Sequence, residues 1–120
     1  MKIKIEELSQ DEIATLLRTA LNGSSWLEID ETSIPNYENA NGKDLYEKMA
    51  NVLMKDDCCV IYSSKNHNQK FYLYLKMIIK GLINALCSGI VKFNIDLYNF
   101  YEANIVLQMS LFGAIVEQYE

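Results

Sequence analysis

Residues 57–82 constrain the fold more than any other part of the chain, because they predict a β-hairpin that runs directly into a helix. An apolar run over 58–62 is followed by the polar residues 63–69, and a second run begins at Lys70. Two such runs around a short gap rich in Ser and Asn are typical of a hairpin. We therefore expect a central β-hairpin at about residues 57–75.

The second run predicts a strand with one buried and one exposed face. Phe71, Leu73 and Leu75 fall on the same face, because side chains on a strand alternate between its two sides. The opposite face carries two lysines and two tyrosines, namely Lys70, Tyr72, Tyr74 and Lys76. From Leu75 to Leu86 the apolar residues recur at helical spacing instead, so a helix is expected to follow, with Gly89 as its stop.

Three further helices are expected. Ser9 and Glu12 form a capping-box signal before an amphipathic stripe that ends at 22–23, an Asn-Gly pair. A second helix is expected over about 43–55. The apolar segment 97–116 predicts another, with a possible break at Gly113.

These elements together predict one α+β domain over residues 1–120. A small antiparallel sheet built on the central hairpin is expected to be covered on one face by about four helices, and Trp26, Leu27 and Ile29 predict a further brief strand. Helices before and after a contiguous hairpin argue against a parallel sheet. The alternation at 2–5 predicts a further short edge strand.

The net charge of −5 conceals a segregation of charge along the chain. Residues 55–92 hold six basic and two acidic side chains, whereas 1–54 hold five and ten, and 93–120 hold none and four. Basic charge therefore gathers on the hairpin and the helix after it. An acidic protein with one basic face is a poor general binder of nucleic acid but can dock an acidic partner.

The sequence also predicts where the protein resides. Residues 1–8 lack the apolar region of a signal peptide, and no apolar stretch is long enough to cross a bilayer. The chain has three cysteines, an odd number, which fits reduced thiols. We expect a cytoplasmic protein without a membrane partner.

The sequence contains no motif that predicts catalysis. Cys58, Cys59, Cys87 and His67 offer four ligands on paper, but their spacing matches no zinc module, and neighbouring side chains on a strand point to opposite faces. We expect no metal, no cofactor and no enzymatic activity. One of the two vicinal cysteines should lie in the core and the other be half-exposed, with Cys87 buried in its helix.

The exposed Tyr/Lys strand face is the sharpest functional signal. Aromatic residues interleaved with lysines are typical of protein interfaces and also of platforms on which nucleic-acid bases stack. Ordinary cross-strand packing is a third interpretation. The absence of arginine from this stretch disfavours base recognition. The predicted partner-binding residues are Tyr62, Lys65, Lys70, Tyr72, Tyr74 and Lys76.

The C-terminal segment from Leu97 predicts self-association. It has no basic residue and many large apolar ones, including Tyr98, Phe100 and Tyr101. Such a segment exceeds what a monomer core is expected to bury, so a homodimer through it is predicted.

Several core-type motifs resemble a known group of proteins. They are Asp11-Glu12-Ile13, the helix end at 19–23 followed by Trp26, the segment 79–82, and Leu107-Gln108 with Leu111-Phe112-Gly113. With these pieces the chain resembles small, mostly uncharacterised proteins of tailed phages and integrated mobile elements. The resemblance implies an accessory role in a bacterial host and brings no catalytic residues. Similar proteins usually carry acidic residues where this chain has Lys65, Lys70 and Lys76.

The expected function is that of a non-enzymatic phage or mobile-element accessory protein that binds a host protein or complex. Small phage proteins of this kind include inhibitors of host defence, such as anti-CRISPR proteins, so the resemblance implies inhibition of a bacterial defence system. A nucleic-acid-associated module that uses the Lys/Tyr face and a purely structural small domain remain alternatives.

Overall fold

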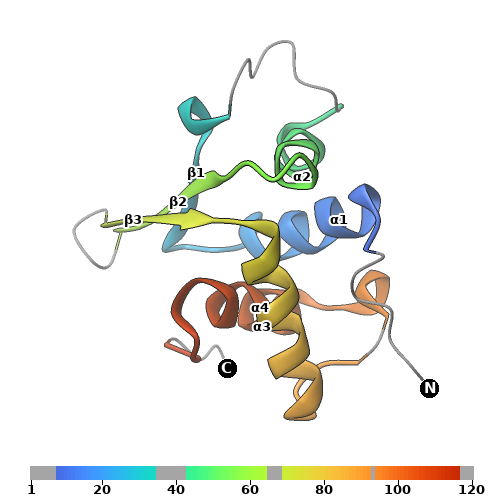
Figure 1. Ribbon diagram of the computed structural model, residues 1–120. Coiled ribbons are helices and arrows are strands. Elements are labelled where there is room, and N and C mark those ends of the chain that lie inside the picture. The colour runs from blue at the N-terminus through green and yellow to red at the C-terminus, as the bar shows by residue number, and fades with distance from the viewer. Residues whose placement is uncertain (1–7, 35–42, 65–68, 93, 117–120) are drawn as a thin grey trace.

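A computed structural model describes residues 8–34, 43–64, 69–92 and 94–116 (Figure 1). In chain order it contains α1 (Gln10–Leu21), β1 (Leu27–Asp30), the 3-10 turn η2 (Glu31–Ser33), α2 (Leu45–Met54), β2 (Cys59–Ser63), β3 (Gln69–Leu73), α3 (Leu75–Cys87), the 3-10 turn η5 (Ile95–Leu97) and α4 (Phe100–Phe112). The predicted α+β class is confirmed. The edge strand expected at 2–5 lies outside the described residues.

The strands form one antiparallel sheet in the order β1-β2-β3. Ile61 in the centre of β2 faces Ile29 on one side and Phe71 on the other. This row belongs to the inner face, where Leu27 and Leu73 are also buried. Helices α1, α3 and α4 lie on the same side of the strands in Figure 1, as expected for a sheet with one covered face.

The hairpin expected to extend to about residue 75 ends slightly earlier, at Leu73. Tyr74 still has an extended backbone, but it is the N-cap of α3, so Lys76 lies in the first turn of that helix. The physical reason lies in the run 77–79, Met-Ile-Ile. A strand would turn one of these apolar side chains to the exposed face, whereas a helix places Ile78 in the core.

Three of the helices begin with a side-chain cap. The capping box of Ser9 and Glu12 at α1 is confirmed, and Asn99 and Glu102 form another at α4. At α2 the carboxylate of Asp44 accepts a hydrogen bond from the Glu47 N–H (2.9 Å). Each cap satisfies amide groups that the helix cannot pair internally.

The ends of α2 and α3 share a geometry in which one residue has a left-handed backbone. At α3 this residue is Gly89, with φ of 72°, as the sequence predicts. At α2 it is Asp56, with φ of 60°. The N–H groups of Asp56 and Asp57 donate to Leu53 and Val52, respectively. An aspartate therefore occupies a position that favours glycine.

Helix α1 ends at Asn22 as predicted, but Gly23 does not form the left-handed turn that an Asn-Gly helix end predicts. Asn22 has a right-handed helical backbone, and Gly23 has no left-handed conformation. A Cβ atom on Gly23 would lie 3.1 Å from the ring of Phe100. The glycine therefore permits close contact with the start of α4 rather than a left-handed turn.

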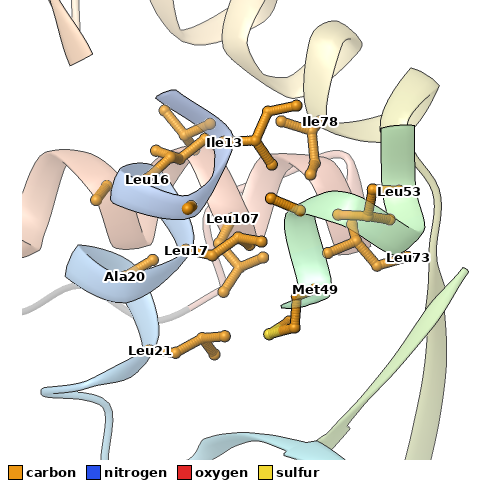
Figure 2. Close-up of a cluster of buried hydrophobic side chains, with 14 of the residues drawn as sticks. Ile13, Leu16, Leu17, Ala20, Leu21, Met49, Leu53, Leu73, Ile78 and Leu107 are labelled. Atoms are coloured by element: carbon orange, nitrogen blue, oxygen red, sulfur yellow. The ribbon is translucent and has the colours of Figure 1, made fainter. Parts of the chain in front are cut away.

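The core lies between the inner face of the sheet and the helices. Figure 2 shows buried side chains from α1, such as Ile13 and Leu17, meeting Met49 and Leu53 from α2. Leu107 from α4 joins the same cluster. None of the helices among the described residues is long and apolar enough to cross a membrane.

Helix α4 packs one face against the rest of the molecule and carries buried polar side chains. Asn104 donates to the carbonyl of Ala20 at the end of α1 (3.0 Å), and Gln108 donates to Asn104 (2.7 Å). The side-chain oxygen Oε1 of Gln108 accepts a hydrogen bond from the main-chain N–H of Val116 (2.8 Å). These bonds connect α4 both to α1 and to the chain beyond its own end.

The C-terminal segment is largely buried within one copy. Tyr98 is buried and Phe100 is half-buried, whereas Leu97 is 70% exposed and Tyr101 is 39% exposed. The tight core contact of α4 thus accounts for much of its apolar character. A homodimer through this segment stays a prediction.

Candidate functional site

The outer face of the sheet holds most of the residues singled out from the sequence. Across the strands, Tyr62 of β2 lies beside Lys70 of β3, and Tyr72 of β3 lies beside Val60. Tyr72 is 57% exposed, and the side chain of Lys70 is 60% exposed. Tyr62 is half-buried. We call Tyr62, Lys70, Tyr72, Tyr74 and Lys76 the Tyr–Lys face.

The Tyr–Lys face continues from β3 into the first turn of α3. Tyr74 is 38% exposed, and the Nζ atom of Lys76 lies 5.9 Å from the centre of its ring. This is within the range of a cation–π contact. A hydrogen bond with the thiol of Cys58 raises the pKa of Tyr74. The tyrosine ring is thus positioned by contacts on two sides while its surface stays accessible.

A hollow of about 300 Å³ adjoins this end of the Tyr–Lys face. Asp56, Tyr74, Leu75 and Lys76 line it. One wall is therefore the left-handed turn that ends α2, and the other is the start of α3. A side chain from a docked protein could enter this hollow beside Tyr74.

Carboxylates flank the Tyr–Lys face on the β1 side. Glu28 faces Tyr62 across the strands, and a hydrogen bond with Glu28 raises the pKa of Tyr62. The Nζ atom of Lys70 lies 3.7 Å from a carboxylate oxygen of Asp30. Hydrogen bonds from Thr32, followed by the charge of Lys70, lower the pKa of Asp30. The outer sheet face is thus acidic on β1 and basic on β3.

Tyr74 and Lys76 occupy positions where helix stability favours other residues. The N-cap of α3 is Tyr74, which makes no side-chain cap, and the first turn contains Lys76 and no acidic residue. Ser, Thr, Asp or Asn at an N-cap stabilises a helix by about 1 kcal/mol relative to residues that cannot cap. A lysine in the first turn is also unfavourable toward the helix dipole. Local helix stability therefore does not explain these two residues.

The cysteines among the described residues do not converge on a chemical site. Lys65 and His67 lie outside the described residues. Cys59 is buried and Cys58 is half-exposed, as expected, and burial raises the pKa of the Cys59 thiol to about 12. No three His, Cys, Asp or Glu residues are grouped to hold a metal ion in the part of the chain that the structure describes.

The expectation that Cys87 is buried was wrong, because the structure shows it exposed. The buried stripe of α3 passes through Ile78, Leu82 and Ala85. Cys87 is five residues beyond Leu82, which places it about 140° away around the helix. It therefore points away from α4.

A second hollow, of about 310 Å³, lies beside β1 and the end of α1. Tyr46 of α2 lines it, and the guanidinium of Arg18 lies 5.8 Å from the centre of that ring. Arg18 also pairs with Asp44 at 2.8 Å. These contacts join α1 to α2, so the cluster has a clear structural role.

Sequence reasoning missed the acidic border of the Tyr–Lys face and the hollow at its end. The alternation of Glu28 and Asp30 in the expected strand near 26–29 could have identified the border. The hollow had no such signal, because it depends on the turn at Asp56. Comparison with family models, curated proteins and solved structures finds no match to this chain.

Proposed function

We propose that this protein is a non-enzymatic accessory protein that binds another protein through the Tyr–Lys face. The observation that carries the proposal is the exposed pair Tyr72 and Tyr74, continued by Lys76; local helix stability does not favour Tyr74 and Lys76 at their positions. Sequences usually agree with local preference at every position, and departures concentrate at functional sites. A docking surface gives these residues a role that packing does not.

Two exposed tyrosines supply contact area at low entropic cost. A tyrosine covers roughly 150–250 Å² when buried and has only two rotatable side-chain bonds to order. Tyr74 is further restrained by Lys76 and Cys58. A side chain that is already restrained loses less freedom on binding, which favours affinity.

Charge favours a protein partner with an acidic contact surface. The stretch from Gln69 to Cys87 contains three lysines, Lys70, Lys76 and Lys80, and no acidic residue. Glu28 and Asp30 border the same face, and two carboxylates would repel the phosphates of a nucleic acid. A protein surface can offer carboxylates to the lysines and other groups to the β1 side.

The resemblance to small phage proteins suggests which kind of protein is bound. Within our proposal the partner is a protein or complex of a bacterial host, and binding inhibits a defence system. Inhibition by docking requires an exposed surface and no catalytic groups. The Tyr–Lys face supplies such a surface.

A capture experiment with matched variants tests the proposal. Tagged protein is used to capture proteins from host lysate at moderate salt, and the captured proteins are identified by mass spectrometry. We compare the wild type, the double variant Tyr72→Ala/Tyr74→Ala, and the control Tyr101→Ala. Tyr101 is exposed to about the same extent as Tyr74, but it lies in the first turn of α4.

The expected result is a stoichiometric host protein that the wild type and the Tyr101→Ala control retain and the double variant loses. Far-ultraviolet circular dichroism of all three proteins checks that the fold is intact. A host protein captured equally by all three would show that the Tyr–Lys face is not the docking surface. Capture of nuclease-sensitive material alone would favour the nucleic-acid alternative.

A further inference from the structure

The hydrogen-bonding direction of each strand can be assigned from two main-chain groups of β2. The N–H of Ser64 donates to the carbonyl of Trp26 (2.9 Å), and the N–H of Val60 donates to the hydroxyl of Ser33 (2.9 Å), which itself donates to the carbonyl of Asp30 (2.6 Å). Both groups therefore point toward β1. Along a strand, the main-chain N–H and C=O groups of successive residues point alternately to the two neighbouring strands. Those of the odd-numbered residues of β2 therefore point toward β3.

The same alternation fixes the orientation of β3. Ile61 and Phe71 face one another, so the main chain of Phe71 points toward β2. The N–H and C=O groups of Lys70 and Tyr72 consequently point away from the sheet, along an edge that no other described strand pairs with; we call it the free edge. Among the described residues, no hydrogen bond from outside the sheet reaches the main chain of either residue.

The free edge of β3 lacks most features that prevent pairing with another strand. It contains no proline, and its register with β2 is continuous from Gln69 to Leu73. Natural edges are usually protected by proline, bulges, charge or a covering element. Lys70 is the single charged residue on this strand, so only registers that bring two copies of Lys70 together are strongly opposed.

We infer that a second copy of this chain pairs with the free edge of β3 in an antiparallel two-fold arrangement. Full overlap of Gln69–Leu73 with the same strand of the second copy places Gln69 opposite Leu73 and Phe71 opposite Phe71. Lys70 then lies opposite Tyr72 of the second copy, and the two Phe71 side chains meet on the inner face. Each Lys70–Tyr72 pair has outward-pointing main chains and exchanges two hydrogen bonds.

This register is complementary in chemistry as well as in direction. Lysine beside tyrosine permits a cation–π contact across the interface, and no like charges face one another. Within one copy Phe71 is half-buried, and the centre of its ring lies 4.8 Å from the centre of the Phe112 ring. Phe71 of the second copy would cover the part of this ring that is still exposed. The pairing would place the Tyr–Lys faces of the two copies side by side. It does not depend on the proposed function.

A charge-swap experiment tests both the dimer and its register. Sedimentation equilibrium from micromolar to millimolar concentration measures the dimer dissociation constant of the wild type. The variant Tyr72→Lys places a lysine opposite Lys70 of the second copy at two equivalent positions, and we expect the constant to rise about tenfold. The double variant Lys70→Tyr/Tyr72→Lys restores a lysine–tyrosine pair at both positions, so dimerisation should return toward the wild-type value.

Both substitutions are on the exposed face of an edge strand, so the fold should tolerate them, and circular dichroism checks this. A wild type that stays monomeric at millimolar concentration would overturn the inference. So would a dimer that Tyr72→Lys leaves unchanged. A dimer that dissociates instead on Leu97→Asp would assign self-association to the C-terminal segment and would also overturn it.

Discussion

Helices α3 and α4 pack so closely at Gly81 that a single methyl group there should destabilise the protein. A Cβ atom on Gly81 would lie 2.7 Å from the main-chain nitrogen of Ser110 and 2.9 Å from its Cα, and would also collide with its hydroxyl. The hydroxyl is held by donation to the carbonyl of Val106 (2.7 Å). Rotation of the Ser110 side chain cannot relieve the two main-chain contacts, so the helices must separate.

The magnitude follows from two opposing effects. Alanine is favoured over glycine inside a helix by about 1 kcal/mol. Overpacking of a core costs about 1–3 kcal/mol, and contact with main-chain atoms belongs at the upper end of that range. For Gly81→Ala we therefore expect a net loss of about 2 kcal/mol in the free energy of unfolding.

Urea denaturation followed by circular dichroism measures this loss. The double variant Gly81→Ala/Ser110→Gly provides the control, because it removes the hydroxyl but keeps the main chain of residue 110. It should remain less stable than Ser110→Gly alone. A Gly81→Ala protein that is more stable than the wild type would refute the close packing of α3 against α4.

Three other perturbations have signs that the structure determines. Replacing Asp56 by glycine should raise the free energy of unfolding by about 1 kcal/mol, because glycine adopts the left-handed backbone there without strain; chemical denaturation measures it. Asn104→Ala should cost about 2 kcal/mol in the same assay, since it leaves the carbonyl of Ala20 and other buried polar groups without their partner. Hydrogen bonds from the first turn of α2, followed by Arg18, lower the pKa of the Asp44 carboxyl group. The ionised carboxylate therefore stabilises the fold at pH values above the ordinary aspartate pKa of about 3.9. This stabilisation is lost as the pH falls through the lower pKa of the folded protein. Asp44→Asn should therefore lose less stability than the wild type below about pH 4, and equal slopes in acid titrations of the two proteins would contradict this assignment.

Much of the fold could be predicted because local signals agree with the tertiary structure. The capping box at Ser9, the hairpin around 57–75 and the stop at Gly89 all act through neighbouring residues. The features that the sequence did not predict are those that depend on contacts between residues far apart in the chain. Gly23 has a helix-ending sequence signal, but its structural role comes from Phe100.

The helix α4 illustrates the same limit. Its apolar sequence predicted self-association, which stays a prediction, but gave no sign of how much of the helix contacts with α1 and α3 bury within one chain. The polar residues Asn104 and Gln108 gave no sign of burial in the sequence. Their hydrogen bonds lead to Ala20 and Val116, which no local pattern could identify.

The sequence predicted that residues of the candidate site are exposed, but it did not predict the shape of the surface that they form. Alternation along the second hairpin strand placed Lys70 and Tyr72 on an exposed face. The same alternation placed the end of the strand too late, because β3 ends at Leu73 and helix α3 begins at Leu75. The acidic border at Asp30 depends on pairing between β1 and β2, which the sequence did not specify.

One substitution at Tyr74 tests directly whether the Tyr–Lys face is maintained for contact rather than for stability. Asparagine at this N-cap can accept a hydrogen bond from the first turn of α3, so Tyr74→Asn should keep or raise the free energy of unfolding, by up to about 1 kcal/mol. The same variant should capture much less of the host protein that the wild type retains. A variant that is clearly destabilised while its partner capture is unchanged would contradict the account, because Tyr74 would then serve the fold and not the interface.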